Sequence, residues 1–348
     1  MDLEWPYPGG IQHFRPPCCP HADCPSRSSP PTPFRYRLRG RYFRLCDRRV
    51  VRRFHCLVCR RSFSVQTFRV DYRLHRPELT GRIFDAFVSK TTQRQTARTL
   101  VCTRQTVRRR LLLLSGHAHE FHTAVLERAA RQGRLPNEYQ FDELETFERD
   151  RLLRPVTMPV LVTKEHPFVV YVQAAPLPSR GKLSPRDEKR KRLMEAKEGV
   201  RRSGSRAAVK HCFEVLKRAL GPGAHPHVET DGKASYKTVL REVFGAGGFL
   251  HGVHSGRLPR RPGSALWPVN HMLAMLRDGL SRLVRRTWGA SRERDWLGRH
   301  AWIWIAYRNY IRGRTNKRKH ESAAQRARIV ARRFSKASLF EWRIVPNA

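Results

Sequence analysis

The spacing of hydrophobic residues changes along the chain, and the first regular stretch is helical. Between about residues 79 and 125, apolar side chains recur every three or four positions, as on one face of a helix. They are Ile83, Phe84, Phe87, Val88, Ala97, Leu100, Val101, Val107 and Leu111. The stretch has no proline and little glycine, and it predicts three helices. Thr103 is expected to cap the third, which begins at Arg104.

From residue 139 the pattern changes to short runs rich in β-branched and aromatic residues. Three runs follow one another, and they predict three consecutive antiparallel strands at 139–147, 156–163 and 168–174. After a highly charged segment, 179–206, the pattern predicts a helix, a short strand and another helix, at 207–220, 227–230 and 234–243. Another strand is expected between His251 and His254. This alternation favours an α/β sheet.

The last part of the chain is helical and then basic. Residues 267–312 predict two helices broken near Gly289, the second rich in tryptophan. Arginine and lysine dominate residues 312–333, which predicts a solvated basic helix or tail.

Six of the eight cysteines lie before position 60, a distribution typical of metal binding rather than of a disulfide framework. Cys56 and Cys59 have the spacing with which two thiolates meet one tetrahedral Zn²⁺, and Cys19 and Cys24 are expected to complete a four-thiolate site. Either of two neighbours could replace Cys19 as a ligand, Cys18 or His21. The remaining candidates, Cys102 and Cys212, fit buried small hydrophobic residues.

Two of the predicted helices, 92–100 and 104–111, are joined by a short turn and match a helix-turn-helix. The second helix would offer four side chains to a DNA major groove: Arg104, Gln105, Arg108 and Arg109. A plain three-helix module with a solvated basic face would have the same pattern. The neighbouring cysteine module and the charge of the chain favour the DNA interpretation.

The charge of the chain points to a polyanionic partner. Seventy lysines and arginines against 29 acidic residues give a formal net charge of +41, which predicts salt-dependent binding to nucleic acid. No stretch has the length of a membrane span, and the first residues lack a secretion signal. We therefore expect no membrane partner and a cytoplasmic, nucleoid-associated protein.

Against this basic background, the acidic residues of Tyr139-Gln140-Phe141-Asp142-Glu143-Leu144-Glu145 stand out. Mg²⁺ is usually held by one or two carboxylates, and the best partner for Asp142 is Asp231, at the end of a short strand and followed by Gly232. Separately, each motif is also typical of a turn or a solvated strand end. Their order along the chain, with three strands and a helix before the second acid, is more specific.

This order resembles the ribonuclease-H-like catalytic domain of bacterial insertion-sequence transposases, and it is most similar to the insertion-sequence-one group. The resemblance runs from the cysteine module through the helix-turn-helix to a Leu-Arg helix at 276–286. It implies an Asp-Asp-Glu enzyme that cuts and rejoins DNA with Mg²⁺ or Mn²⁺, with Asp142 and Asp231 as the first two acids.

The resemblance places Asn270 at the position where the family usually has its third acid, a glutamate. Asn270 offers a carbonyl oxygen to a hard cation but brings no negative charge. Asp278 lies eight residues further along the same predicted helix, and Glu143 and Glu145 are other possible aids, although strand alternation turns both away from Asp142. Asn270 could instead cap the helix that follows it.

The chain is therefore expected to be multidomain. The predicted parts are an N-terminal tail at 1–16, a zinc ribbon at 17–70, a helix-turn-helix region at 79–125, an α/β ribonuclease-H-like catalytic domain at 136–312 and a basic C-terminal tail at 313–348. We expect a transposase that binds double-stranded DNA, both the terminal inverted repeats and the target, as a homo-oligomer with structural Zn²⁺. The alternatives are a decayed transposase acting as a DNA-binding regulator and an unrelated zinc-dependent RNA-binding protein.

Overall fold

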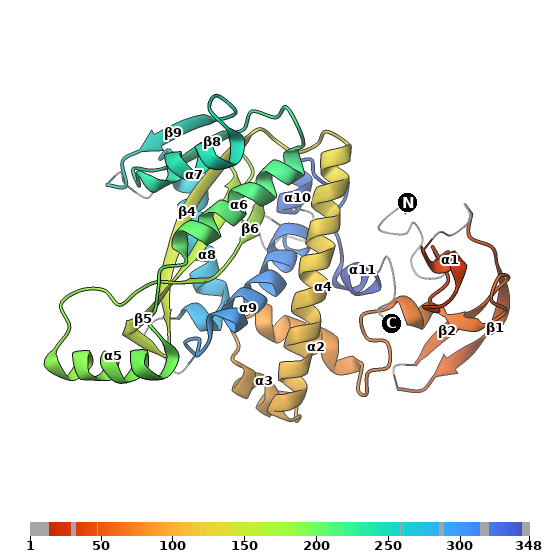
Figure 1. The fold of residues 1–348 in the computed structure, drawn as a ribbon. Coiled ribbons are helices and arrows are strands. Elements are labelled where there is room, and N and C mark those ends of the chain that lie inside the picture. Colours follow the sequence, from red (N-terminus) through yellow and green to blue (C-terminus); the bar gives the residue numbers. More distant parts are fainter. Residues whose placement is uncertain are drawn as a thin grey trace.

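The structure is a computed structural model that describes residues 14–28, 33–46, 48–257, 259, 261–284, 289–313 and 320–342. Within these residues the buried apolar side chains form two clusters, one between positions 14 and 68 and one between positions 70 and 340. We call the first region the N-terminal module and the second the main body. Figure 1 shows the module at one end of the molecule, coloured red to orange.

The N-terminal module is a small antiparallel sheet with an aromatic core. Its strands are β1 (Tyr36–Arg44), β2 (Arg49–Cys56) and β3 (Ser62–Ser64), in the order β1-β2-β3. The short helices α1 (Pro25–Ser28) and η2 (Val65–Phe68) flank them. Neighbouring rings pack together in the core, which contains Phe14, Phe34, Phe54, Phe63 and Phe68.

The three predicted helices are confirmed as α2 (Glu78–Val88), α3 (Gln93–Thr99) and α4 (Arg104–Arg131). The Thr103 hydroxyl accepts a hydrogen bond from the backbone N–H of Thr106 at 3.1 Å, so Thr103 caps α4 as expected. However, α4 is longer than predicted. Its apolar stripe continues through Phe121 to Ala129 and packs against helices of the main body.

The main sheet has the order β6-β5-β4-β8-β9, and β7 also pairs with β5. Its strands are β4 (Glu138–Glu148), β5 (Asp150–Thr163), β6 (Val169–Val172), β7 (Ala175–Pro176), β8 (His227–Asp231) and β9 (Leu250–His254). β5 runs antiparallel to β4 and β6, whereas β4, β8 and β9 are parallel. The predicted antiparallel triplet and the predicted α/β sheet are confirmed.

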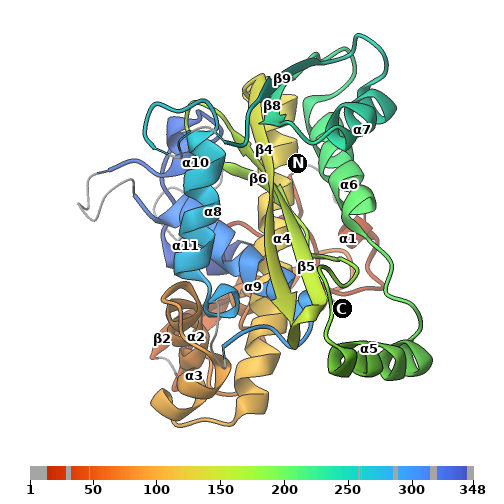
Figure 2. The same ribbon diagram turned by 90° about the vertical axis from the view of Figure 1, so that its left-hand side faces the viewer.

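Helices cover both faces of this sheet. Figure 2 shows α6 (Ser205–Leu220) and α7 (Ser235–Phe244) on one side of the strands and α8 (Trp267–Gly279) and α9 (Arg294–Ala306) on the other. Strand alternation on β4 explains this: Phe141 packs against rings of α6 and α7, whereas the Gln140 amide bonds the backbone at the start of α8. The charged segment contains α5 (Pro185–Glu198), which has no buried residue and protrudes from the body.

The prediction of a solvated basic tail is wrong for residues 320–342. After α9 and the π-helix η4 (Tyr307–Ile311), the chain forms α10 (Ala323–Arg326) and α11 (Lys336–Glu341) against the main body. Leu339 is buried, and its carbonyl lies 2.7 Å from the His117 imidazole of α4. The apolar residues that alternate with the lysines and arginines of this segment are part of the core of the main body. They are Ala323, Ala324, Ile329, Phe334, Leu339 and Phe340.

The ranges 79–125 and 136–312 share this one core, so the boundary expected between them does not separate two hydrophobic cores. None of the helices in the described ranges is long and apolar enough to span a membrane.

Candidate functional site

The two candidate aspartates lie where neighbouring strands separate. β4 and β8 pair in parallel only near their beginnings, and the last pair is Gln140 with Glu229. Asp142 and Asp231 each lie two residues beyond this pair, so they are at the same level and on the same face of the sheet. A gap thus opens between the middle of β4 and the carboxyl end of β8, and strand carboxyl ends are the position at which α/β sheets bind ligands.

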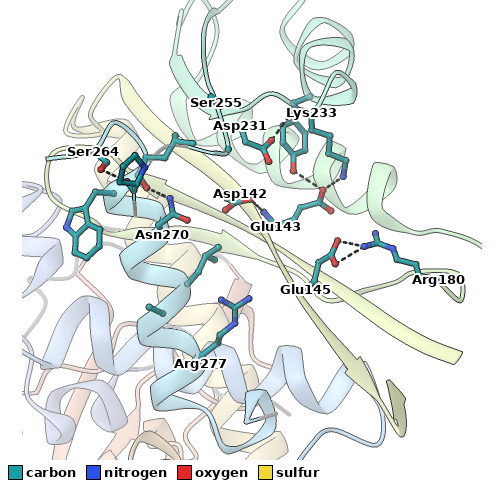
Figure 3. A pocket seen from close by; sticks show the side chains of 17 residues that line it. Asp142, Glu143, Glu145, Arg180, Asp231, Lys233, Ser255, Ser264, Asn270 and Arg277 are labelled. Carbon is teal, nitrogen blue, oxygen red and sulfur yellow. Dashed lines mark hydrogen bonds and ion pairs between the residues drawn. The ribbon is translucent and has the colours of Figure 1, made fainter. Parts of the chain in front are cut away.

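Asp142, Asp231 and Asn270 all line one cavity of about 500 Å³ at this gap (Figure 3). A buried tyrosine on α7 gives a second sign that the two aspartates are close. Burial raises the pKa of Tyr236 first, the Glu143 carboxylate raises it further, and the charges of Asp231 and Asp142 add to the effect. Both aspartates therefore act electrostatically on the same phenol.

Backbone N–H groups orient both carboxylates. The Asp142 Oδ1 accepts a hydrogen bond of 2.7 Å from the N–H of Glu143, and the Asp231 Oδ1 accepts one of 3.2 Å from the N–H of Lys233. Each carboxylate is therefore oriented in part by the backbone of its own segment, Asp142 by β4 and Asp231 by the turn after β8.

Asn270 reaches the same cavity from the first turn of α8. Its Nδ2 donates to the Leu266 carbonyl at 2.9 Å, and Figure 3 shows its amide oxygen directed toward Asp142. The side chain bonds a carbonyl rather than an N–H, and the N-cap of α8 is Leu266, so the capping role considered for Asn270 is wrong. Asp278 is 83% exposed, pairs with Lys90 at 3.3 Å and does not line the cavity.

Glu143 is more involved than sequence reasoning anticipated. It faces α6 and α7, as alternation predicts, but it still lines the cavity because the gap opens between the strands. Its carboxylate accepts hydrogen bonds from Thr157 (2.9 Å), Ser205 (2.6 Å) and Tyr236 (2.9 Å) and pairs with Lys233. Burial alone would raise the pKa of Glu143, but these donors, led by Lys233, hold the pKa below its ordinary value.

Sequence reasoning missed Lys233, although its position two residues after Asp231 placed it near the site. Glu145, also considered as an aid, lines the cavity. Both of its carboxylate oxygens accept hydrogen bonds from one guanidinium nitrogen of Arg180, at 2.6 and 2.7 Å. The acidic cluster of β4 therefore divides into Asp142, which shares the α8 face with Asp231, and two glutamates that pair with cations.

The predicted cysteine cluster forms in the N-terminal module. The four sulfur atoms of Cys19, Cys24, Cys56 and Cys59 all lie within 4.8 Å of one another. The Cys19–Cys59 and Cys24–Cys56 sulfur distances are 3.6 and 3.9 Å. Tetrahedral Zn–S bonds of about 2.3 Å place sulfurs roughly 3.8 Å apart, so this donor set fits Zn²⁺.

The alternative ligands are not part of this cluster: within the described residues, neither Cys18 nor His21 joins the four sulfurs. Cys212 is fully buried on α6, as expected of a small hydrophobic residue, and Cys102 is half-buried in the turn before α4.

The four candidate DNA-contacting residues are exposed on the first turns of α4, directly after α3 and a short turn. They are Arg104, Gln105, Arg108 and Arg109. Arg108 also lies over the ring of Trp296, 4.9 Å from its centre, which ties this face of α4 to α9. The helix pair is therefore present and accessible, and its insertion into a DNA groove stays a prediction.

No protein-family model and no curated protein matches the chain. Among solved structures, it is similar to the Mos1 mariner paired-end complex with Mn, at 12% identity over 62% of this chain and 70% of that chain, with a TM-score of 0.23. The catalytic domain of Mos1 mariner transposase gives 14% identity, 57% and 91% coverage and a TM-score of 0.22. The Mos1 strand transfer complex has 13% identity over 66% of this chain and 76% of that chain, with a TM-score of 0.21. Scores this low do not establish a common fold.

Proposed function

We propose that this protein is a DNA transposase that binds the ends of a mobile element and catalyses metal-dependent strand cleavage and transfer. The observation that supports this most is the convergence of Asp142, Asp231 and Asn270 on one cavity from two separate strands and a helix. In this proposal the three are the catalytic residues of a polynucleotidyl transferase of the Asp-Asp-Glu type, with asparagine in the third position.

The donor set fits a hard divalent cation, because it offers two carboxylates and an amide oxygen around one cavity. When bound, Mg²⁺ or Mn²⁺ would activate water or a DNA 3′-hydroxyl as nucleophile and stabilise the departing oxygen. Backbone N–H groups orient the carboxylates of Asp142 and Asp231, which supports this role.

Charged residues around the three candidates set the charge balance of the cavity. Lys233 neutralises Glu143, so the carboxylates of Asp142 and Asp231 carry the negative charge on the cation side. Arg277, about two turns from Asn270 on α8, lines the same cavity and would supply positive charge toward DNA phosphates, whereas Arg180 is paired with Glu145. Because Asn270 is neutral, the site attracts cations less strongly than three acids would, and it repels phosphate less.

DNA binding in this proposal belongs to the first half of the chain. The Zn²⁺-bound cysteine cluster would stabilise the N-terminal module, and α3 and α4 would form a helix-turn-helix that presents Arg104, Gln105, Arg108 and Arg109 to duplex DNA. The formal net charge of +41 supports a partner with many phosphates. The element's inverted repeats and a second copy of the chain would complete the assembly.

The proposal is tested by incubating the protein with Mg²⁺ or Mn²⁺ and duplex DNA that carries the inverted repeats flanking the reading frame. We expect strand cleavage and transfer by the wild type and none by Asp142→Ala or Asp231→Ala. Asp278→Ala, an acid on α8 outside the cavity, is the matched control and should retain activity. Specific binding to these ends without cleavage by the wild type would contradict the enzyme and favour a DNA-binding regulator.

A further inference from the structure

Arg308, on the π-helix η4, is a half-buried cation on which no carboxylate of the described residues acts. Its Nε atom is buried and has no hydrogen-bond partner among the described residues. The Nε of Arg110 is also buried without a partner, but the charges of Asp71 and Glu78 act on that guanidinium, and it donates to the His75 carbonyl at 2.7 Å. Arg282 donates to the Ser291 hydroxyl at 3.3 Å, and the charge of Glu293 acts on it. Burying a charge without a partner is costly, so Arg308 needs an explanation.

The charges around Arg308 increase this cost. Burial lowers its pKa first, and the guanidinium groups of Arg312 and Arg326 lower it further. No carboxylate contributes among the described groups that act on it. We call Arg308, Arg312 and Arg326 the arginine cluster. All three side chains are half-buried, so each remains accessible to a ligand from solvent.

The arginine cluster lies next to the helix that carries Asn270. Arg308 is the cation that acts on His271, the residue after Asn270 on α8. On another side, Arg326 lies 3.0 Å from the Nδ1 of His166, whose Nε2 is 3.4 Å from the exposed Glu165. The cluster thus joins η4, α10 and the loop before β6 beside the cavity's helix.

We propose that the arginine cluster is a binding site for a phosphate group of the DNA backbone. Guanidinium groups present planar N–H donors that match phosphate oxygens, and a phosphate would supply the negative charge that Arg308 lacks while contacting its two neighbours. This inference rests on the proposed function, because it assigns the phosphate to DNA held next to α8. The free protein would then carry an electrostatic cost that DNA binding relieves.

The test compares Arg308→Met with Arg282→Met, a control in which the buried arginine has partners. Without ligand, Arg308→Met should raise the melting temperature, because an apolar side chain replaces an uncompensated charge, whereas Arg282→Met should lower it. Inorganic phosphate, compared with chloride at equal ionic strength, should raise the melting temperature of the wild type and of Arg282→Met but not of Arg308→Met.

DNA binding is then measured by fluorescence anisotropy in EDTA at several salt concentrations, so the result does not depend on catalysis. Loss of one phosphate contact in Arg312→Gln or Arg308→Met should reduce the slope of log affinity against log salt by about 0.9. A lower melting temperature for Arg308→Met with an unchanged response to phosphate would overturn the site. A lost response to phosphate with an unchanged DNA slope would overturn the assignment to DNA in favour of a free phosphate ion.

Discussion

The N-terminal module and the main body differ in the kind of core that stabilises them. In the module, the buried cluster is small and includes four cysteines along with its aromatic rings. In the main body, one continuous apolar core runs from Val70 to Phe340 through helices on both faces of the sheet. Each region gathers side chains suited to a metal ion, and we expect only the module to depend on its metal to fold.

This difference assigns two separate roles to metal. A domain of about 60 residues is only marginally stable from its hydrophobic core, and a structural Zn²⁺ then contributes folding free energy directly. The aspartates of the main body are placed by strands that fold through apolar burial, so a cation there would serve chemistry rather than folding. Removing each metal site should therefore have a different consequence.

The largest effect is expected in the module. Cys56→Ser should abolish zinc binding and unfold residues 14–68 while the main body stays folded, because structural Zn²⁺ contributes about 10–16 kcal/mol in small zinc-binding peptides. Zinc content and hydrogen exchange measure both outcomes. Cys46→Ser, an exposed cysteine outside the cluster, is the control. Full protection of the module's amides in Cys56→Ser would refute a folding role for the metal.

In the main body, Glu143→Gln should lower the free energy of unfolding by about 3 kcal/mol, because it breaks a buried ion pair. This is the low end of the usual range of about 3–5 kcal/mol, since the Lys233 side chain is 44% exposed. Urea denaturation measures the loss. Glu145→Gln removes the exposed pair with Arg180 and should cost less than about 1 kcal/mol. Equal losses in the two variants would show that Glu143 is not a structural anchor.

The same variant has a defined pH dependence. The pKa of Glu143 in the folded protein lies below its ordinary value of 4.5, so the ion pair contributes stability above that pH. The stability difference between wild type and Glu143→Gln should be complete at neutral pH and shrink as pH falls below about 4.5. Denaturation curves between pH 3 and 7 check it; a difference that grows toward low pH would contradict the sign.

A smaller loss is expected where two helices meet in the main body. A Cβ on Gly279 would overlap the ring of Trp304, so Gly279→Ala should lower the free energy of unfolding by about 1–3 kcal/mol. Gly298 on α9 faces open space, and Gly298→Ala should instead stabilise by up to about 1 kcal/mol through helix propensity. Thermal denaturation distinguishes the two, and a stable Gly279→Ala would mean that α8 and α9 are packed less closely.

The smallest effect is expected from restoring the third acid. Asn270→Glu adds a negative charge at the cavity and should tighten Mn²⁺ binding by about tenfold, or about 1.4 kcal/mol, without changing the fold of the module. Calorimetric titration measures the affinity. Asn270→Ala should weaken binding, and unchanged affinity in both variants would exclude this residue as a ligand.

Local patterns predicted much of this architecture. Periodicity located the helices and the antiparallel strands, and the order of Asp142 on the first strand and Asp231 at the end of a later one predicted that they line one cavity. The cysteine spacing identified the four members of the cluster. In these cases the neighbours in sequence carry the structural signal.

What the sequence did not reveal depends on contacts between distant segments. The extension of α4 and the packing of residues 320–342 follow from burial against the main body, which a basic composition concealed. The pairing of Glu143 with Lys233 joins β4 to the residues just before α7 and has no local signature. The arginine cluster likewise brings together segments that the charge of the sequence alone does not single out.

The central claim, that the cavity between β4 and β8 is a divalent-cation site, is tested most directly by calorimetric titration of Mn²⁺ into the zinc-loaded protein. The account predicts binding by the wild type and by Asp278→Ala, and at least about tenfold weaker binding by Asp142→Ala and Asp231→Ala, since each loses one of two carboxylates. Equal Mn²⁺ affinity in all four proteins would contradict it.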